Sequence, residues 1–451
     1  SLHIERATVR LHLPDEPKPL ELSIPGMAVD CRPSARVNLS GALGQPAAAG
    51  SAPLSVSAQA ASAGGASAAV TFSNLDLSAL PVARLARLPL RKLAGWADGS
   101  LDLRITRQGV VDGLDWRLRV RKLDAQSAAD IQLPVIDEAL IDVSAAYDQI
   151  TNALHVRSAR IRLPGMADLH CRADVGAGVL DGQWDAIDSL EIVGQVQPEK
   201  LSAMLTGRRE LPGELAISGP VNVLVRADRQ NDLRVRMSAD ATTAEIRRGT
   251  RVIKPAGRAW DMGLVGLLDC RTTGFDVGES WLKIGENQFT GYGAVVSLRK
   301  LAGELADPNH ANVGQTLLTA LARLDWRGQW EINQVPALVE LFDRERLPLA
   351  LDELRLTGPL TGRWFIHHGP ATHIHAIFHA AADAGLTVGD YFRQPAGVPL
   401  DLTAGFSIDP NTGDMTDMTA ELAAGTARLG IERLEVSLPR DGDDAMTIDG
   451  R

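Results

Sequence analysis

Short sequence landmarks recur along this chain at a nearly constant interval. The run Leu22–Ala28 returns as Ile161–Ala167, so that Pro25 of the first copy corresponds to Pro164 of the second. The run Leu215–Pro220 returns as Leu354–Pro359, and the interval from Gly219 to Gly358 equals the interval from Pro25 to Pro164. Recurrence at a fixed interval is typical of a fold built from copies of one supersecondary unit.

Two further landmarks keep nearly the same spacing. Lys254-Pro255-Ala256-Gly257 recurs as Gln394-Pro395-Ala396-Gly397 after almost the same interval. Leu2–Arg6 matches Leu429–Arg433, and the interval from Ile4 to Ile431 is close to three times that interval. We therefore expect a piece of a longer array, divided into the end of a preceding repeat unit at residues 1–74 and repeat units at 75–190, 191–328 and 329–451.

The units are rich in strands with one apolar face. Leu101, Leu103 and Ile105 alternate with polar residues, and the same period of two is found in other runs of the chain, which contain Trp116, Leu118, Val120, Leu233, Val235, Met237, Leu400, Leu402 and Phe406. Such alternation predicts half-buried β-strands. Turn signals such as Asp112-Gly113 and Asn411-Thr412-Gly413 are spaced for hairpins, so we expect a mainly β fold with an antiparallel sheet.

Short helices are expected once per unit, near Val82–Leu88, Pro198–Leu205 and Val335–Phe342, with a further one at Gly314–Leu324. The apolar strand faces are aliphatic and nearly free of aromatic residues, and one helix per unit cannot cover them. The sheet must therefore pack on a second sheet, close on itself, or curl around something apolar.

The bulk composition excludes some classes of function. A formal net charge of -10 argues against a nucleic-acid-binding surface, which needs an excess of Lys and Arg. No apolar run reaches the roughly 18 to 20 residues that cross a bilayer, so the part of the protein given by this sequence is expected to be soluble. Cys31, Cys171 and Cys270 are widely separated and indicate neither a metal knuckle nor a disulfide framework.

The densest candidate for chemistry is a group of histidines at positions 367, 368, 373, 375 and 379. Two hairpin strands could bring several imidazoles together for zinc. However, His373, His375 and His379 alternate with apolar residues as a solvated outer face does, so we predict no metal site.

Other candidates also have plain structural interpretations. Each cysteine is followed by an arginine, which could activate a thiol, but a small buried Cys in a strand explains them better, and His170 should point away from Cys171. Gly291-Tyr292-Gly293 lacks the spacing of a phosphate loop and is interpreted as a turn or bulge. Asp443-Asp444 is interpreted as a solvated turn. We predict neither catalytic residues nor a cofactor, and expect that the protein is not an enzyme.

The strand-rich unit has Leu211-Pro212 followed by Gly219-Pro220 at its start, and the landmark Lys254–Gly257 later. On these features the sequence resembles AsmA-like proteins of Gram-negative envelopes. The resemblance implies a long, curled antiparallel sheet whose inner face forms an apolar groove. It also implies a periplasmic location, tethered to the inner membrane by an anchor outside this sequence, and a role in moving phospholipid toward the outer membrane.

The sequence-based hypothesis is therefore a passive conduit in which phospholipid acyl chains lie against the apolar strand faces. The residues predicted to line the groove are Leu101, Leu103, Ile105, Trp116, Leu118, Val120, Leu233, Val235, Met237, Leu400, Leu402 and Phe406. Two alternatives stay open, a structural or adhesive β-solenoid of the envelope and a carbohydrate-active solenoid. The second predicts clustered acids and exposed aromatic residues, against which the aromatic content of 4% speaks.

Overall fold

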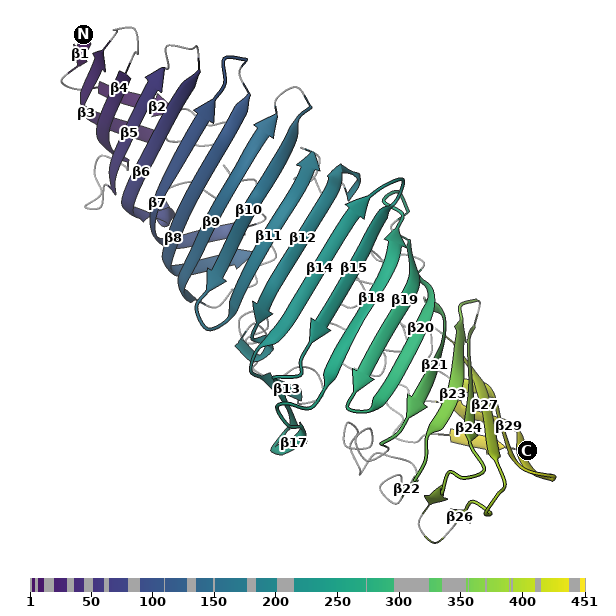
Figure 1. Cartoon of the computed structure of the whole chain (residues 1–451). Coiled ribbons are helices and arrows are strands. Elements are labelled where there is room, and N and C mark those ends of the chain that lie inside the picture. Colours follow the sequence, from purple (N-terminus) through teal and green to yellow (C-terminus); the bar gives the residue numbers. More distant parts are fainter. Residues whose placement is uncertain are drawn as a thin grey trace. The chain divides into compact units, whose positions relative to one another are not determined.

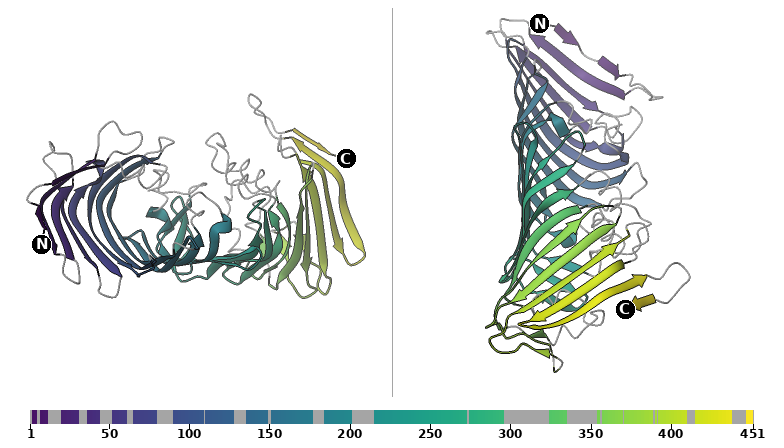
Figure 2. Two further views of the ribbon diagram at one scale, coloured as in Figure 1. Left: turned by 90° about the horizontal axis from the view of Figure 1, so that it is seen from above. Right: turned by 90° about the vertical axis from the view of Figure 1, so that its right-hand side faces the viewer.

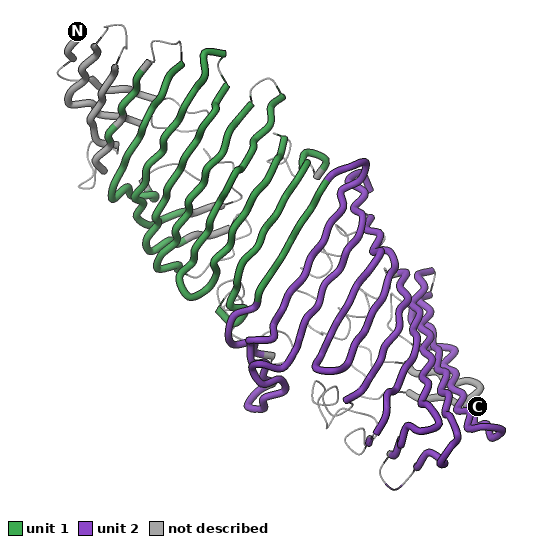
Figure 3. Tube along the Cα trace, in the orientation of Figure 1, with its two compact units in different colours: residues 1–211, 222–228 green, residues 212–221, 229–451 purple. Residues whose placement is uncertain are grey.

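The fold is mainly β, as predicted. The computed structural model describes residues 2–4, 7–11, 20–30, 36–43, 52–60, 65–79, 90–108, 110–127, 135–148, 151–176, 184–200, 215–272, 274–295, 324–334, 354–355, 357–369, 371–388, 390, 392–409, 415–437 and 447–450. The chain divides into two compact units, residues 1–211 with 222–228, and residues 212–221 with 229–451 (Figure 3). The repeat boundaries expected from the sequence stay a prediction.

Unit 1 is an antiparallel sheet. β1 and β2 pair with β3, and from β3 each strand pairs with the next as far as β12. The strands are β1 (Leu2–Ile4), β2 (Ala7–Leu11), β3 (Leu20–Asp30), β4 (Arg36–Leu43), β5 (Ala52–Ala60), β6 (Ala66–Asp76), β7 (Leu90–Ile105), β8 (Val111–Ser127), β9 (Ile136–Asp148), β10 (Ala153–Leu163), β11 (Ala167–Gly176) and β12 (Ile187–Val196). Residues 222–228 of β14 (Val221–Arg229) lie beside β12, since Asn222 accepts a hydrogen bond from Gln195.

Unit 2 repeats this architecture. Antiparallel pairs join β15, β18, β19, β20, β21, β23, β24, β27, β28, β29 and β30 in that order (Figure 1). Their bounds are β15 (Leu233–Asp240), β18 (Trp260–Leu268), β19 (Phe275–Ile284), β20 (Asn287–Val295), β21 (Leu324–Ile332), β23 (Leu360–His367), β24 (Thr372–Ala380), β27 (Leu400–Ile408), β28 (Met415–Ala424), β29 (Ala427–Ser437) and β30 (Thr447–Gly450).

The sheet of each unit is open, because its first and last described strands do not pair with each other. Figures 1 and 2 show each as a single layer of strands, and Figure 2 shows that the long strands of unit 1 are curved. Helix is scarce among the described residues. It consists of the 3-10 turns η1 (Leu77–Ala79) and η3 (Trp184–Ala186) and helical residues 198–200, where the predicted Pro198–Leu205 helix begins. The other predicted helices lie outside the described residues, apart from Leu324, which begins β21.

A crease crosses three neighbouring strands of unit 1. Asn74 in β6, Gly95 in β7 and Lys122 in β8 have φ angles of 52°, 136° and 51°, and the β6–β7 and β7–β8 registers shift beside them. Bulges of this kind bend the strand and increase its twist. A Cβ on Gly95 would lie 2.9 Å from the carbonyl oxygens of Arg121 and Lys122, so glycine is needed there.

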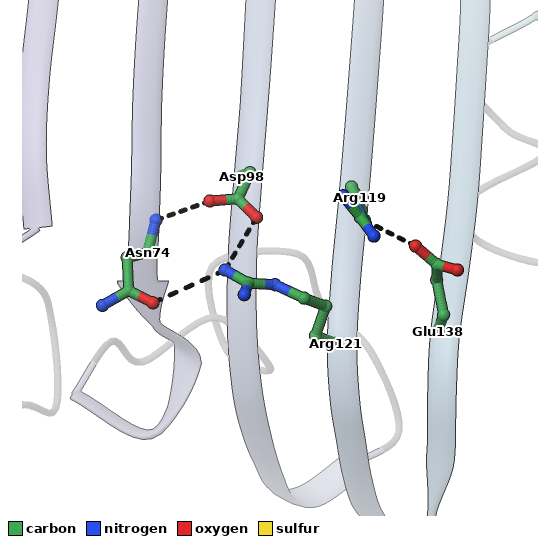
Figure 4. A network of polar contacts seen from close by, with 5 residues as sticks. All are labelled: Asn74, Asp98, Arg119, Arg121 and Glu138. Carbon is green, nitrogen blue, oxygen red and sulfur yellow. Dashed lines mark hydrogen bonds and ion pairs between the residues drawn. The ribbon is translucent and has the colours of Figure 1, made fainter.

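The crease is held on both faces of the sheet. On one face, Leu75 and Leu77 pack with Ala97, Val120 and Ala139 in a buried cluster. On the other, the Asp98 carboxylate accepts a hydrogen bond from the Asn74 amide N–H at 2.8 Å and pairs with Arg121 at 2.9 Å (Figure 4). The bend is therefore fixed by packing on the first face and by polar contacts on the second.

Two small three-stranded sheets explain part of the sequence repeat. β13 (Leu215–Ser218), β16 (Glu245–Arg248) and β17 (Arg251–Lys254) form one, and β22 (Leu354–Arg355), β25 (Thr387–Val388) and β26 (Phe392–Arg393) form the other. Each first strand precedes a Gly-Pro step, and each last strand ends at the Lys/Gln-Pro-Ala-Gly landmark. The landmarks at 215–220 and 254–257 thus mark the same element in both copies.

Lys254 and Gln394 occupy equivalent buried positions, with 1% and 7% of their surface exposed. Lys254 Nζ donates to the carbonyl oxygens of Thr242 at 3.0 Å and Ala244 at 2.5 Å. Gln394 Nε2 donates to those of Ala381 at 2.7 Å and Val398 at 2.8 Å. Both side chains therefore satisfy backbone carbonyls of the turn that closes the small sheet, which explains why two dissimilar residues share one position.

The landmark at Pro25-Gly26 and Pro164-Gly165 does not repeat in the same way. Pro25 and Gly26 lie inside the single strand β3, where the register with β4 shifts between Ser23 and Gly26. Pro164 and Gly165 form the turn between β10 and β11. The two copies of this sequence thus have different secondary structures.

Replacing Lys254 tests its role as a buried donor. Lys254→Gln keeps a side-chain N–H as Gln394 does, so we expect little change in Tm. Lys254→Met leaves buried carbonyls without a donor and should lower the free energy of unfolding by about 1–3 kcal/mol. Thermal and denaturant unfolding measure both variants, and equal stabilities of the Gln and Met variants would contradict this role.

The same residue gives a pH dependence. Burial lowers the pKa of Lys254 from its ordinary value of 10.5, so between the lowered pKa and 10.5 the unfolded chain binds more protons than the folded chain. Stability due to this group therefore rises with pH in that interval. The free energy of unfolding of the wild type, relative to Lys254→Gln, should increase as the pH is raised toward 10.5. Parallel profiles would show that folding leaves the pKa of Lys254 unchanged, and a decrease would show that folding raises it; either result would contradict the lowered pKa.

Candidate functional site

The predicted lining residues of unit 1 share one face of its sheet, here called face 1, and Asp102 and Arg104 lie on the opposite face 2. Cross-strand partners place side chains on a common face. One face 1 row crosses six strands through Leu103, Leu114, Ala145, Val156, Ala173 and Leu190. The next row runs through Leu101, Trp116, Val143, Ala159, Cys171 and Ile192. Neither row contains a charged residue.

The six predicted residues of unit 1 differ in burial. Val120 is buried in the crease cluster and is a local core residue. Trp116 is 36% exposed, and Leu101, Leu103, Ile105 and Leu118 are half-buried. The middle of the strands therefore leaves part of these side chains uncovered by the described residues.

Unit 2 has a face 1 of the same kind, carrying Leu233, Val235 and Met237, and a face 2 carrying Arg234 and Arg236. One face 1 row crosses ten strands through Ala239, Met262, Leu282, Phe289, Trp330, Gly362, Phe378, Leu402, Leu422 and Leu429. Leu233 and Leu400 are buried, Val235, Leu402 and Phe406 are half-buried, and Met237 is 39% exposed. Leu400 packs with Ala380 and Ala384 beside the second small sheet.

Aromatic residues are more frequent on face 1 of unit 2 than predicted from the sequence. Trp330 is the cross-strand partner of Gly362, and Trp364 is the partner of Gly328. Each indole lies over its glycine: a Cβ on Gly362 would contact Trp330, and a Cβ on Gly328 would lie 2.7 Å from ring carbons of Trp364. Trp330 also packs against Phe378 with ring centroids 4.7 Å apart. The period-two run Trp326-Arg327-Gly328-Gln329-Trp330 is the signal that could have located them.

Face 2 of unit 1 is covered by ion pairs. Arg119 pairs with Glu138 at 2.5 Å, Arg160 pairs with Asp168 at 2.6 Å, and Arg226 pairs with Glu191. The guanidinium of Arg160 lowers the pKa of Asp168 through its hydrogen bonds, and Arg226 does the same for the pKa of Glu191. These exposed pairs keep face 2 charged and hydrated, in contrast to face 1.

A depression of about 440 Å³ on face 2 of unit 1 brings together a Ser, a His and an Asp. Asp174 accepts hydrogen bonds from His155 Nδ1 at 2.7 Å and Ser189 Oγ at 2.8 Å, which lower the Asp174 pKa. In a nucleophilic triad the histidine lies between the serine and the acid. Here the acid lies between them, so the serine is not activated, and the arrangement supports an ion-pair network rather than acyl transfer.

The histidines of the candidate metal cluster lie mostly on face 2 of unit 2. His367 Nδ1 lies 2.8 Å from Asp325, and His373 Nδ1 lies 2.8 Å from Ser407. His379 pairs with Asp401 at 2.8 Å, and His375 packs against Phe365. Within the described parts of the chain, no three His, Cys, Asp or Glu residues gather as a metal site would need.

The remaining sequence candidates are placed as follows. Cys171 lies on face 1 opposite Ala159, while His170 lies on face 2 opposite Arg160; burial raises the pKa of the Cys171 thiol, so it is not an activated nucleophile. Gly291-Tyr292-Gly293, interpreted from the sequence as a turn or bulge, lies inside β20 and is not a turn, but the register with β19 shifts beside it, as at a bulge. Cys31 and the pair Asp443-Asp444 lie outside the described residues.

No protein-family model matches the chain, and no curated protein matches it. Among solved structures, the crystal structure of Pseudomonas aeruginosa OpdQ is similar with a TM-score of 0.17 and 9% sequence identity, over 93% of this chain and 90% of that chain. A likeness at this score carries no argument about fold or function. In the part of the chain that the structure describes, no helix has the length and apolar character of a membrane span.

The Trp–Gly pairs of face 1 can be tested with two alanine substitutions in strands of unit 2. Gly328→Ala places a methyl group against the Trp364 ring and the Thr290 carbonyl, and overpacking of this kind costs about 1–3 kcal/mol. Gly278→Ala is the matched control, because its Cβ would have its nearest neighbour 3.8 Å away. Chemical unfolding should show a loss of stability for the first variant only; equal effects would mean that the tryptophan does not occupy the space above Gly328.

Proposed function

We propose that face 1 of each unit binds phospholipid acyl chains, and that the protein is a passive lipid conduit of the bacterial envelope. The observation that carries the proposal is the run of uncharged face 1 rows, six strands wide in unit 1 and ten in unit 2, with partly exposed Leu, Val, Met and Trp side chains. Partly exposed apolar surface of this extent is unfavourable in water and marks a binding surface.

The dimensions of these rows suit an acyl chain. Neighbouring strands lie ~4.8 Å apart, so a row across six strands extends roughly 24 Å. An acyl chain fills half of a ~30 Å hydrocarbon layer, or roughly 15 Å. A row is therefore longer than one chain, and several rows side by side provide a surface on which a chain can slide without a fixed binding position.

The chemistry of the two faces supports the same proposal. Burial of methylene groups against aliphatic side chains stabilises by ~25 cal/mol per Å² and has no directional requirement. Face 2 carries Arg–Asp and Arg–Glu pairs, which would lose their hydration under a lipid tail at a cost in free energy. Face 2 is therefore expected to stay in contact with water. In this proposal the head groups stay in water at the open margin of the face, and no residue needs to react.

The envelope location is the part of the proposal that depends on the resemblance to AsmA-like proteins. That resemblance implies a chain tethered to the inner membrane that reaches through the periplasm, with phospholipid moving between the inner and outer membranes. The apolar rows are compatible with such a path, because movement along them replaces one aliphatic contact with another of nearly equal free energy.

The first test is the lipid content of the full chain purified without detergent. We expect native mass spectrometry and solvent extraction to recover bound phospholipid, since a surface of this kind keeps an apolar ligand through dilution. Recovery of folded protein without phospholipid, together with no transfer of a fluorescent phospholipid between vesicles, would favour the structural scaffold instead.

The second test places one carboxylate on each face of the same strand. Leu103→Asp and Val235→Asp put a charge on face 1, where an acyl chain would desolvate it at a cost of several kcal/mol, so phospholipid transfer should fall at least about tenfold. Ser100→Asp and Arg234→Asp put the charge on face 2 of the same two strands and should leave transfer within about twofold. Circular dichroism and Tm verify folding, and equal losses from both faces would contradict an acyl-binding face 1.

A further inference from the structure

Face 2 of unit 2 has a depression of about 550 Å³ over β20, β21, β23 and β24. A row of direct cross-strand partners, Thr290, Gln329, Arg363 and Ile377, forms its floor. A second row, Gln288, Glu331, Thr361 and His379, lines one side. The register therefore gathers two amides, two hydroxyls, a guanidinium, a carboxylate and an imidazole over four neighbouring strands.

Several of these groups have no partner among the described residues. The side chains of Gln288, Thr290, Gln329 and Arg363 make no hydrogen bond, ion pair or other polar contact there. Face 2 of unit 1 differs, because Arg119, Arg160 and Arg226 each pair with a carboxylate. Unpaired planar polar groups at a concave site are available to a ligand.

An aromatic row borders the other side of the depression. Tyr292, Arg327, Phe365 and His375 are direct cross-strand partners. Tyr292 is 50% exposed and Phe365 37% exposed, Arg327 lies over the Tyr292 ring at 5.2 Å, and the Phe365 and His375 rings are 6.0 Å apart. Because this row is two residues along each strand from the floor row, the two lie roughly 7 Å apart.

Aromatic rings beside unpaired amides and a guanidinium match the chemistry of a sugar chain. A pyranose ring packs its C–H face on the negative face of an aromatic ring, and its hydroxyl groups both donate to and accept from Gln, Arg and Glu side chains. The charges nearby balance, since Arg327 and Arg363 are offset by Glu331 and by Asp401, which pairs with His379. A balanced surface favours an uncharged ligand over an anionic polymer.

We propose that this surface, formed by the floor row, the Gln288 row and the aromatic row, binds an uncharged oligosaccharide. Tyr292 and Phe365 are the stacking residues, and Gln329 and Arg363 bind the hydroxyl groups. The site is on the face opposite the proposed acyl-binding face, and it does not depend on lipid binding. A cell-envelope protein with such a site would be held against a neutral glycan while its other face stays free.

The test uses the full chain with cellohexaose and chitohexaose, two uncharged hexasaccharides, followed by saturation-transfer NMR and isothermal titration calorimetry. We expect binding of at least one of them with a Kd between about 10 µM and 1 mM. Tyr292→Ala and Phe365→Ala should each weaken it about fivefold, the value of one aromatic contact, and Gln329→Ala should weaken it about as much.

Leu267→Ala is the matched control, since Leu267 is 46% exposed on face 2 of the same unit but lies in β18, outside the depression. The affinity of the Leu267→Ala variant for the hexasaccharide should equal that of the wild type. All of these variants replace exposed residues, and an unchanged Tm verifies that each variant is folded. Absence of binding of either hexasaccharide at about 10 mM, or equal affinity of a Tyr292→Ala/Phe365→Ala double variant, would overturn the proposal. Preferential binding of the anionic sugar polygalacturonate would overturn the assignment of an uncharged ligand.

Discussion

The register of the antiparallel strands is the constraint on which the rest of this structure depends. Side chains alternate between the two faces with a period of two, so a slip of one residue would transfer the Leu103 row to face 2 and the Arg104 row to face 1. Every feature of the two faces, from the uncharged rows to the ion pairs and the aromatic row of unit 2, is a set of residues that only correct register brings together. A single-layer open sheet has no second sheet to enforce that register, so it must be fixed within the layer itself.

The described residues show three ways in which it is fixed. In unit 1, the crease through Asn74, Gly95 and Lys122 marks one position along each of three neighbouring strands. A shift of register between two of these strands would separate the bent residues of one strand from those of the next. In unit 2, Trp330 and Trp364 fit over the glycines opposite them, and a shift would place each indole against a side chain. In the two small sheets, buried Lys254 and Gln394 close the turn that follows β17 and β26.

Much of the architecture could be predicted from the sequence, because alternation in single strands is a local property. The period-two runs around Leu101 and Leu233 identify strands and their apolar sides, and the Lys254–Gly257 landmark identifies an element that recurs. The pairing partners of the strands could not be predicted in this way. The opposition of Trp330 to Gly362, or of Tyr292 to Arg327, depends on which strands are neighbours and in what register, and neither is encoded in a single strand. For the same reason no sequence pattern indicates the crease, whose Asn74 and Lys122 are ordinary residues in unusual backbone conformations.

The two proposals give the faces separate tasks, with acyl chains on face 1 and water or a glycan on face 2. Photo-crosslinking from neighbouring residues of one strand tests this division most directly, with a benzophenone side chain at Leu101 on face 1 or at Asp102 on face 2. After purification from cells and irradiation, mass spectrometry should find phospholipid adducts at position 101 and essentially none at position 102. Adducts at neither position, or at both to the same extent, would contradict an acyl-binding face.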